Sequence, residues 1–109
     1  MALMSKPEEW ALIAIWKLGD CAYSVTIRDL INQLTQKKWT FGAIWDTLDR
    51  LKKKGYLDSH FSQPERVRGG KSKRMYTLSS LGLDALVEIK RVRERSWEGI
   101  ALESIERRL

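Results

Sequence analysis

The sequence predicts a mainly α-helical domain with one small antiparallel β-hairpin. Two observations lead to this prediction. Apolar residues recur at helical spacing along several segments, and two short alternating segments, Tyr56–Phe61 and Met75–Leu78, flank a loop rich in glycine and basic residues. The order helix, strand, basic loop, strand is typical of a winged helix. We therefore expect a winged helix-turn-helix over residues 1–79 and a long C-terminal helix over residues 80–109, together forming one compact unit.

Length and charge limit the class of protein. The 109 residues are enough for one modest core, and a hydrophobic content of 43% excludes general disorder. The formal net charge of +6 favours an anionic partner such as nucleic acid or a membrane surface. The cations are concentrated in three stretches, Arg50–Lys54, Arg66–Arg74 and Lys90–Arg95, and this clustering favours a specific contact over mere solubility.

Cysteine content and apolar runs bear on the compartment. Cys21 is the only cysteine, so no intramolecular disulfide can form and a reducing compartment suits the chain. We expect Cys21 to be a small core residue rather than a redox sensor. The longest apolar run, Trp10–Trp16, is far shorter than a membrane span, and residues 1–9 lack the layout of a signal peptide. The expected location is the cytoplasm, with no membrane partner.

The first helix is expected to follow a capping box. Ser5 and Glu8 have the required spacing, and Pro7 is tolerated in a first helical turn. The run Trp10–Trp16 is apolar all round, so this helix must be buried on more than one side. In so small a domain, one side is expected to pack on the core and another to meet a second subunit. Gly19 ends the helix.

Two further helices are expected in close succession. Thr26 opens the second, and a short polar connection, residues 35–38, leads to a third helix that Thr40 caps and Gly55 closes. Two helices joined so closely predict a helix-turn-helix geometry. Their apolar stripes are Ile27, Leu30, Ile31 and Leu34 on the second helix, and Phe41, Ile44, Leu48 and Leu51 on the third.

The last helix is expected to begin at Ser79 or Ser80 and to run as far as Leu109. At 1.5 Å per residue it would be roughly 45 Å long, too long to pack wholly on its own domain. Gly99 costs such a helix about 1 kcal/mol relative to alanine, and Lys90 interrupts its apolar stripe. An intermolecular helix pair is the expected arrangement. The predicted dimer interface comprises Trp10, Ile13, Leu86, Trp97, Ala101 and Ile105.

The side of the third helix opposite Ile44 carries small and polar residues. Gly42 and Ala43 allow the helix backbone to lie close to DNA, and first-turn amides behind a Thr40 cap suit a phosphate. Asp46 either accepts a hydrogen bond from a cytosine amino group or repels phosphate. The expected DNA contacts on this helix are Thr40, Gly42, Ala43, Trp45, Asp46, Arg50 and Lys53.

Two residues of this helix also have an interpretation that involves no contact with DNA. Asp49 is expected to be merely solvated. Trp45 lies at the edge of the apolar stripe, where filling the core and contacting a groove or phosphate through its indole N–H are equally favoured.

The loop between the two strands is the second expected DNA contact. Residues 64–74 hold five basic side chains against one acid, around Gly69 and Gly70. Long cations on such a loop can follow phosphates or enter a minor groove, although a charge run is often only a solvated loop. The expected contacts are Arg68, Lys71, Lys73 and Arg74.

Catalysis has little support in the sequence. His60 is the only histidine and has no cysteine nearby, which excludes the usual zinc clusters and a histidine-based triad unless subunits share one. No glycine-rich phosphate loop of the Walker or dinucleotide type is present. We expect a protein that is not an enzyme and binds neither metal nor cofactor.

These residues together resemble the PadR family of bacterial transcriptional regulators. The recognition helix of that family typically reads Ser-x-Gly-Thr-Ile-Tyr-Pro, followed by Leu-x-Arg-Leu-Glu-x-x-Gly, and the corresponding runs here are Thr40–Asp46 and Leu48–Gly55. The wing signature Gly-Arg-Pro-Arg-Lys-Tyr-Tyr-x-Leu-Thr is matched by Gly70–Ser79, with Gly82 where a further glycine is expected. The resemblance covers roughly residues 8–90.

The resemblance carries expectations about function and also has departures. Such regulators are homodimers joined by their first and C-terminal helices, many are repressors, and some short members bind flat aromatic compounds between subunits. Here Ala43, Trp45 and Asp46 replace the family's Thr, Tyr and Pro, so the operator sequence cannot be transferred. Tyr23–Val25 stands where His-Gly-Tyr is usual.

The sequence therefore predicts a homodimeric, sequence-specific regulator that binds double-stranded DNA. The resemblance further implies a repressor that a small aromatic ligand releases. Trp97 and Ile100 are the candidate ligand residues, although the filling of a dimer core is the favoured interpretation of Trp97. The main alternative is a winged helix that contacts only proteins. A second alternative is a winged helix that binds RNA.

Overall fold

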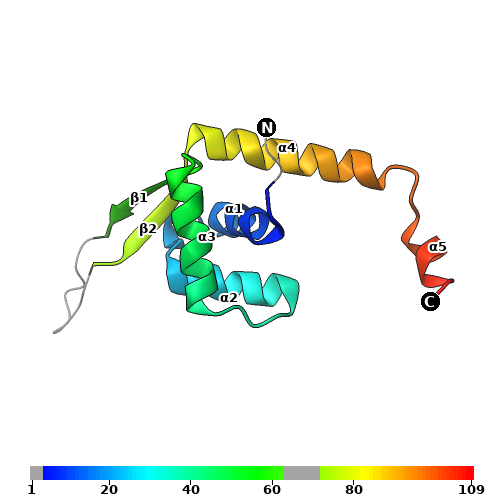
Figure 1. Cartoon of the computed structure of the whole chain (residues 1–109), viewed down its shortest axis with the longest axis horizontal. Coiled ribbons are helices and arrows are strands. Elements are labelled where there is room, and N and C mark those ends of the chain that lie inside the picture. The colour runs from blue at the N-terminus through cyan, green and yellow to red at the C-terminus, as the bar shows by residue number, and fades with distance from the viewer. Residues whose placement is uncertain (1–3, 63–71) are drawn as a thin grey trace.

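The computed structural model describes residues 4–62 and 72–109. Arg68 and Lys71, expected at the tip of the loop, lie outside these residues. Figure 1 shows a helical body from which a hairpin projects at one end and a long helix at the other. The elements are α1 (Lys6–Leu18), the short 3-10 helix η1 (Gly19–Cys21), α2 (Ser24–Thr35), α3 (Phe41–Lys53), β1 (Leu57–Phe61), β2 (Arg74–Leu78), α4 (Ser80–Trp97) and α5 (Leu102–Glu106).

Helix α1 lies at the centre of the fold, in contact with α2, α3, α4 and β2. Its apolar run supplies the middle of the core, and α2 and α3 pack against it through the predicted stripes. Two members of the predicted stripes, Leu34 and Phe41, are exposed rather than buried. The buried core consists of Ala11, Leu12, Ala14, Ile15, Ala22, Ile27, Ile31, Ile44, Leu48, Leu51, Leu57 and Ala85.

Local signals place most helix ends where the sequence predicts them. The Ser5–Glu8 capping box is present at α1, and Gly19 ends that helix with a φ of 57°. The expectation that Thr26 opens α2 is wrong. The helix begins at Ser24, and Thr26 Oγ1 instead accepts a hydrogen bond from the Tyr23 amide at 3.0 Å, completing a capping box from inside the first turn.

The hairpin is antiparallel and pairs Leu57 with Leu78 and Phe61 with Arg74. Both strands match the prediction to within one residue. The start of α4 lies tightly against the beginning of this hairpin, because a Cβ at Gly82 would collide with the Tyr56 carbonyl oxygen. This close approach gives a physical reason for a glycine at position 82.

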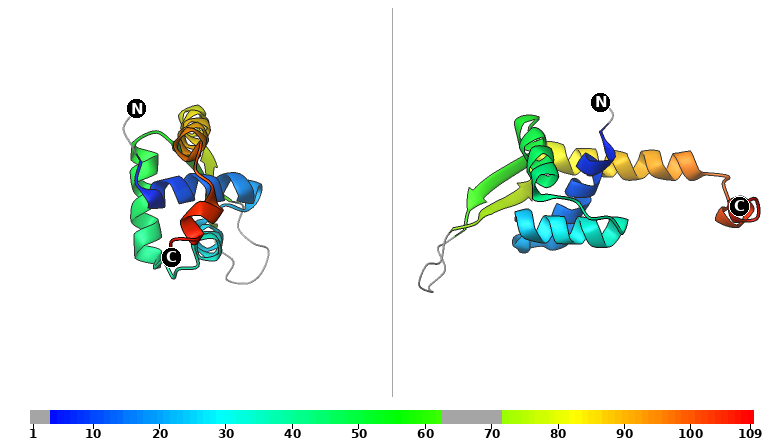
Figure 2. Two further views of the ribbon diagram at one scale, coloured as in Figure 1. Left: turned by 90° about the vertical axis from the view of Figure 1, so that its right-hand side faces the viewer. Right: turned by 60° about the horizontal axis from the view of Figure 1, so that its bottom comes forward.

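The prediction of one helix from residue 80 to Leu109 is wrong. Ser79 caps α4 by accepting a hydrogen bond from the Gly82 amide at 3.1 Å, but the helix ends at Trp97. Glu98 leaves the helical region and Gly99 adopts a φ of +79°. The chain then forms the short helix α5, beyond the end of α4 (Figures 1 and 2). The division of the chain at residue 79 stays a prediction.

The expectation for Cys21 is also wrong. Its side chain is exposed at the end of η1, and the neighbouring Ala22 fills the core position instead. A 3-10 turn places successive side chains about 120° apart, so only one of the two neighbours can face inward. Within residues 4–62 and 72–109, no helix is long and apolar enough to cross a membrane. The cytoplasmic location stays a prediction.

Candidate nucleic-acid interface

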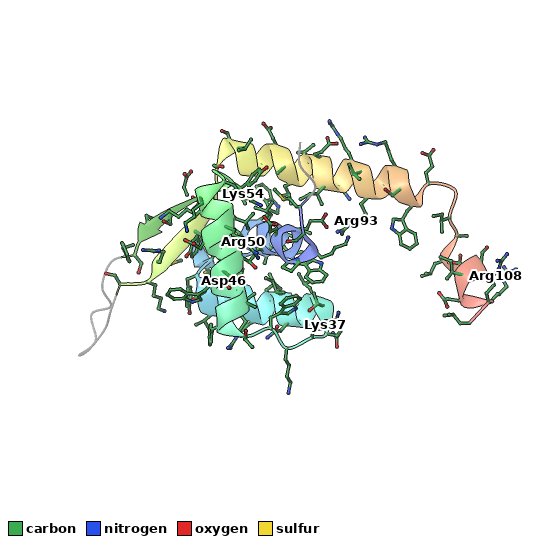
Figure 3. All side chains as sticks on the ribbon, in the orientation of Figure 1. Lys37, Asp46, Arg50, Lys54, Arg93 and Arg108 are labelled. Carbon is green, nitrogen blue, oxygen red and sulfur yellow. The ribbon has the colours of Figure 1, made fainter. Side chains whose placement is uncertain are left out.

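Helix α3 presents one buried and one exposed face. Ile44, Leu48 and Leu51 are buried against the body. The opposite face is open to solvent, and Figure 3 shows Asp46, Arg50 and Lys54 spaced along it. Of the residues expected to contact DNA here, Ala43 is half-buried. The exposed ones are Thr40, Gly42, Trp45, Asp46, Arg50 and Lys53.

The first turn of α3 has the predicted cap. Thr40 Oγ1 accepts a hydrogen bond from the Ala43 amide at 3.2 Å. The first amides of a helix have no intrahelical acceptor, so they remain available to an external group. A Cβ built on Gly42 would meet only Thr40 Oγ1, at 3.9 Å. The glycine is therefore not required for internal packing, and its absent side chain leaves the helix backbone accessible from outside.

Aromatic side chains lie on the exposed side rather than in the core. Trp45 is 64% exposed, which favours the interpretation of a surface contact over that of core packing. The guanidinium of Arg28, from α2, lies 3.8 Å from the centre of the Phe41 ring. Arg28 also pairs with Asp29 at 3.0 Å. Sequence reasoning missed Arg28, because its partner Phe41 is distant along the chain and belongs to another helix.

Asp49 and Lys53 form an ion pair along the exposed face. Lys53 Nζ lies 2.8 Å from Asp49 Oδ2, one helical turn away. The hydrogen bond from Lys53 lowers the pKa of Asp49, and the same bond raises the pKa of Lys53. Asp49 is solvated as expected, but it also neutralises one of the predicted phosphate contacts. Arg74, at the loop end of β2, adds slightly to the lowering of the Asp49 pKa.

The loop end of the hairpin carries Lys73 and Arg74, the two cations of the predicted wing that the structure describes. Arg74 lies 5.3 Å from the Phe61 ring centre, and Lys73 lies 4.5 Å from that of Tyr23. The strands are held together at this point because the Ser62 amide donates to the Lys73 carbonyl oxygen at 2.8 Å.

Trp39 fixes the connection between α2 and α3. Its amide donates to Asn32 Oδ1 at 2.7 Å, and its indole N–H donates to Thr35 Oγ1 at 3.3 Å. Trp10 of α1 packs edge-on against it, with ring centres 5.6 Å apart. Trp10, expected at a dimer interface, is thus half-buried within its own chain. Sequence reasoning missed Trp39, whose only signal was a tryptophan in an otherwise polar connection.

A buried carboxylate connects α1 to the end of α3. Glu8 is only 5% exposed, and its Oε2 accepts a hydrogen bond from Lys54 Nζ at 3.0 Å. Burial raises the pKa of Glu8, but hydrogen bonds from Lys54 and Ser5 outweigh burial and hold it below its ordinary value. The next residue, Glu9, pairs with Arg93 of α4 at 3.1 Å. The first turn of α1 therefore contacts both the C-terminal end of α3 and the side of α4.

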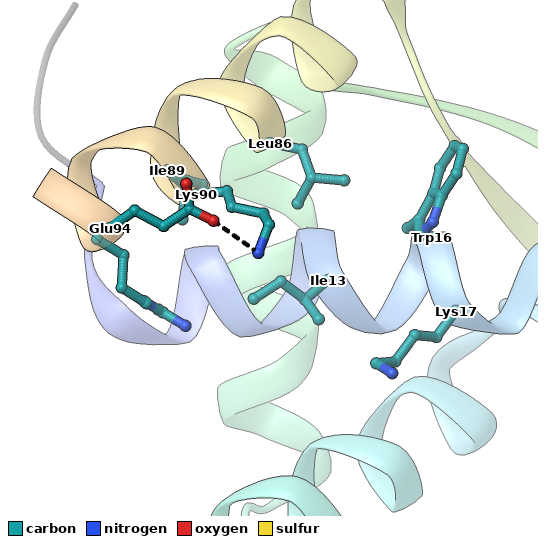
Figure 4. Close-up of a pocket in the computed structure, with 8 residues that line it drawn as sticks. Ile13, Trp16, Lys17, Leu86, Ile89, Lys90 and Glu94 are labelled. Carbon is teal, nitrogen blue, oxygen red and sulfur yellow. Dashed lines mark ion pairs between the residues drawn. The ribbon is translucent and has the colours of Figure 1, made fainter. Parts of the chain in front are cut away.

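A groove of about 620 Å³ lies between α1 and α4 (Figure 4). Ile13 and Leu86, two residues of the predicted dimer interface, line it. Trp97, a third predicted interface residue, is 51% exposed and does not line this groove. Ala101 and Ile105, two more of the predicted interface residues, line a second hollow near the C-terminus. The hollow, about 430 Å³, is lined by Gly99, Ile100, Ala101, Ser104, Ile105, Arg108 and Leu109.

Metal-binding chemistry has no assembled site in the part of the chain that the structure describes. No group of three or more His, Cys, Asp or Glu side chains lies together there. His60 is exposed on β1.

Comparison with known proteins supports the fold. No protein-family model matches the chain, and no curated protein matches its sequence. Solved structures do match. A PadR family transcription regulator from Clostridium difficile has 23% identity and a TM-score of 0.67, with 93% of this chain and 99% of that chain covered. A PadR-like transcription factor from Bacteroides fragilis has 19% identity and a TM-score of 0.71, with 85% and 84% covered.

A third match is BpsR of Bordetella bronchiseptica, whose DNA binding is regulated by 6-hydroxynicotinic acid. Its identity is 15% and its TM-score 0.63, with 92% of this chain and 70% of that chain covered. These likenesses confirm the predicted fold, a winged helix-turn-helix of the PadR type.

Proposed function

We propose that this chain is a sequence-specific, double-stranded DNA-binding transcription regulator that acts as a homodimer. The observation that carries the proposal is the open face of α3, where Trp45 and Arg50 are exposed beside a basic hairpin. A helix of this kind is the element that enters a major groove in helix-turn-helix proteins, while a wing contacts the backbone. The PadR-type fold supports the same conclusion.

Each part of the surface has a distinct role in the proposal. The side chains of Ala43 and Asp46 read base edges, because a short side chain permits close approach and a carboxylate can accept from a cytosine amino group. Arg50, Lys53 and the wing cations bind phosphates and supply affinity without sequence information. Lys53 must exchange Asp49 for a phosphate oxygen. This exchange keeps one favourable charge contact and leaves Asp49 facing the solvent.

Dimerisation follows from the apolar surface that the single chain leaves uncovered. Trp16, Val87 and Trp97 are all exposed along α1 and α4. Two symmetric subunits would bind two half-sites together, which raises operator affinity well above that of one domain. Truncation after Lys90 tests this part: we expect a monomer or an aggregate with much weaker operator binding. A well-folded truncated dimer in light scattering would refute it.

The proposal further includes repression of transcription and release of the protein from DNA by a small aromatic molecule. Repression is the role that the resemblance to PadR regulators implies, and Trp97, half exposed, offers an indole face for a flat ligand. The proposed site lies between the two Trp97 side chains of a dimer, near Ile100. The DNA binding of BpsR is regulated by 6-hydroxynicotinic acid, a flat aromatic acid, which supports this class of ligand.

Selection of bound duplexes from a random pool, repeated with candidate aromatic molecules, tests the function as a whole. A shared half-site repeated with two-fold symmetry is the expected result. Two other outcomes favour the alternatives. Preferential retention of single-stranded RNA would indicate an RNA-binding winged helix, and the absence of any salt-dependent nucleic-acid affinity would indicate a protein-interaction module.

A further inference from the structure

Three cations within residues 4–62 and 72–109 lie over aromatic rings that belong to other elements of the fold. The pairs are Arg28 with Phe41, Lys73 with Tyr23, and Arg74 with Phe61. Lys73 and Arg74 belong to the wing, whose cations bind phosphates in the proposed function. Arg28, on α2, shares their arrangement but has no role in that proposal. Its position and its hydrogen bonds therefore bear on whether it is a further contact with DNA.

Phe41, the ring beneath Arg28, lies beside the open face of α3. It is the first residue of that helix and is exposed. Trp45 follows one turn later, on the same side of the helix, and is exposed as well. The guanidinium of Arg28 lies 3.8 Å from the centre of the Phe41 ring, at the end of α3 that contacts α2 (Figure 1). Arg28 is therefore placed at the edge of the surface that faces DNA in the proposed function.

The guanidinium of Arg28 is oriented by two contacts and keeps donors for a third. Besides the Phe41 ring, Asp29 holds it, because Arg28 Nε and Nη2 both donate to Asp29 Oδ1, at 3.3 and 3.0 Å. A guanidinium has further N–H donors in the same plane, and the hydrogen bonds among the described residues do not use Nη1 of Arg28. The Asp29 side chain is exposed, and ion pairs at the surface contribute little stability. Arg28 can therefore still bind an external anion.

We propose that Arg28 binds a phosphate of the DNA backbone beside α3, and that Phe41 is the residue that positions it. A guanidinium is a planar cation whose N–H groups match phosphate oxygens. An aromatic ring against it restricts the long side chain before DNA arrives, so less conformational entropy is lost when the contact forms. This inference rests on the proposed DNA binding, and it adds a contact from α2 to those of α3 and the wing.

The salt dependence of binding to a mixed-sequence DNA duplex tests the phosphate contact, because contacts with phosphates do not require an operator. Arg28→Gln should reduce the magnitude of the slope of log affinity against log salt by about 0.9. Lys6→Gln is the matched control, since it also removes a cation from a surface ion pair, but at the start of α1. Its slope should equal that of the native protein. A native slope in Arg28→Gln would overturn the phosphate contact.

Phe41→Leu tests the positioning role. The variant keeps the charge of Arg28, so the slope should not change, while affinity should fall about two- to five-fold at every salt concentration, as expected for the loss of an exposed cation–ring contact. Phe41→Tyr keeps the ring and should bind like the native protein. In the Arg28→Gln background, Phe41→Leu should have no further effect, because Phe41 acts through the guanidinium.

Two results would overturn the positioning role of Phe41. Native affinity in Phe41→Leu would mean that the ring does not assist Arg28, and an equal loss with and without Arg28 would mean that Phe41 acts independently. The native protein separates this inference from its premise. Salt-dependent duplex binding by the native protein, with an unchanged slope in Arg28→Gln, rejects only the contact from α2. The absence of such binding in the native protein rejects the proposed function itself.

Discussion

Glu8, at the start of α1, and Lys54, the residue that follows α3, form an ion pair of 3.0 Å between Nζ and Oε2. Glu8 is buried and Lys54 is half exposed, so the lysine reaches down from the surface to the carboxylate. The contact joins the end of the proposed recognition helix to the central helix of the core. Its loss should therefore affect both folding stability and the placement of α3.

Lys54→Met should lower the free energy of unfolding by about 1–2 kcal/mol, because it leaves a buried carboxylate without its charged partner. Urea unfolding followed by circular dichroism measures the change. Lys53→Met is the matched control, since both Lys53 and its partner Asp49 are exposed and such pairs contribute little. Equal stability of the two variants would show that the Glu8 contact is not stabilising.

The same pair predicts a dependence of stability on pH. The pKa of Glu8 is lowered in the folded chain from its ordinary value of 4.5. A carboxyl with a depressed folded pKa contributes stability above its unfolded pKa and loses it as pH falls through the folded pKa. Stability should therefore decline below about pH 4.5 more steeply in the native chain than in Glu8→Gln. Parallel stability curves for the two proteins over this range would contradict the assignment.

The wing cations should control the salt dependence of DNA binding. Neutralising Lys71 and Lys73 together should weaken all duplexes about equally and lower the slope of log affinity against log salt by about 2. The control with the same charge change is Lys6→Gln with Arg91→Gln, two exposed residues of α1 and α4. An unchanged slope in the wing variant would remove the wing from the interface.

The open face of α3 should determine sequence preference. Replacement of Ala43 or Asp46 should change the preferred base at one or two operator positions, by about 1–3 kcal/mol for a lost bidentate contact. Binding to a panel of single-base operator variants measures the change. A uniform loss across the whole panel would mean that this helix only positions the protein on the backbone.

Trp97 should report a bound aromatic ligand. A planar cationic dye is expected to quench tryptophan fluorescence in the intact protein and to lose that effect in Trp97→Ala while the dimer persists. Trp45→Ala is the comparison, because Trp45 is similarly exposed but lies on α3. Equal quenching in native protein and Trp97→Ala would leave Trp97 as a packing residue only.

Sequence reasoning succeeded where the signal is local. The cap at Thr40, the capping box at Ser5 and Glu8, and the alternation of the two strands each depend on neighbouring residues, and the structure confirms them. The PadR-type fold followed from two such motifs, at Thr40–Gly55 and Gly70–Ser79.

Sequence reasoning failed where distant segments meet or where opposing effects on stability are close in magnitude. Neither the Glu8–Lys54 pair nor the stacking of Arg28 on Phe41 has a signature in adjacent residues. The only sequence signal for a break at Gly99 is a helix penalty of about 1 kcal/mol relative to alanine, which does not by itself predict the end of a helix. Residues 91–97 are all exposed, so burial adds little to the stability of this part of the helix, and about 1 kcal/mol is enough to break it.

The affinity of the intact protein for duplex DNA as a function of salt tests the central claim most directly. If α3 and the wing form a DNA interface, log affinity should fall linearly with log salt, with a slope of about −0.9 for each phosphate contacted, and duplex DNA should outcompete single-stranded RNA. Duplex affinity that does not change with salt, or no duplex affinity at low salt, would contradict the claim.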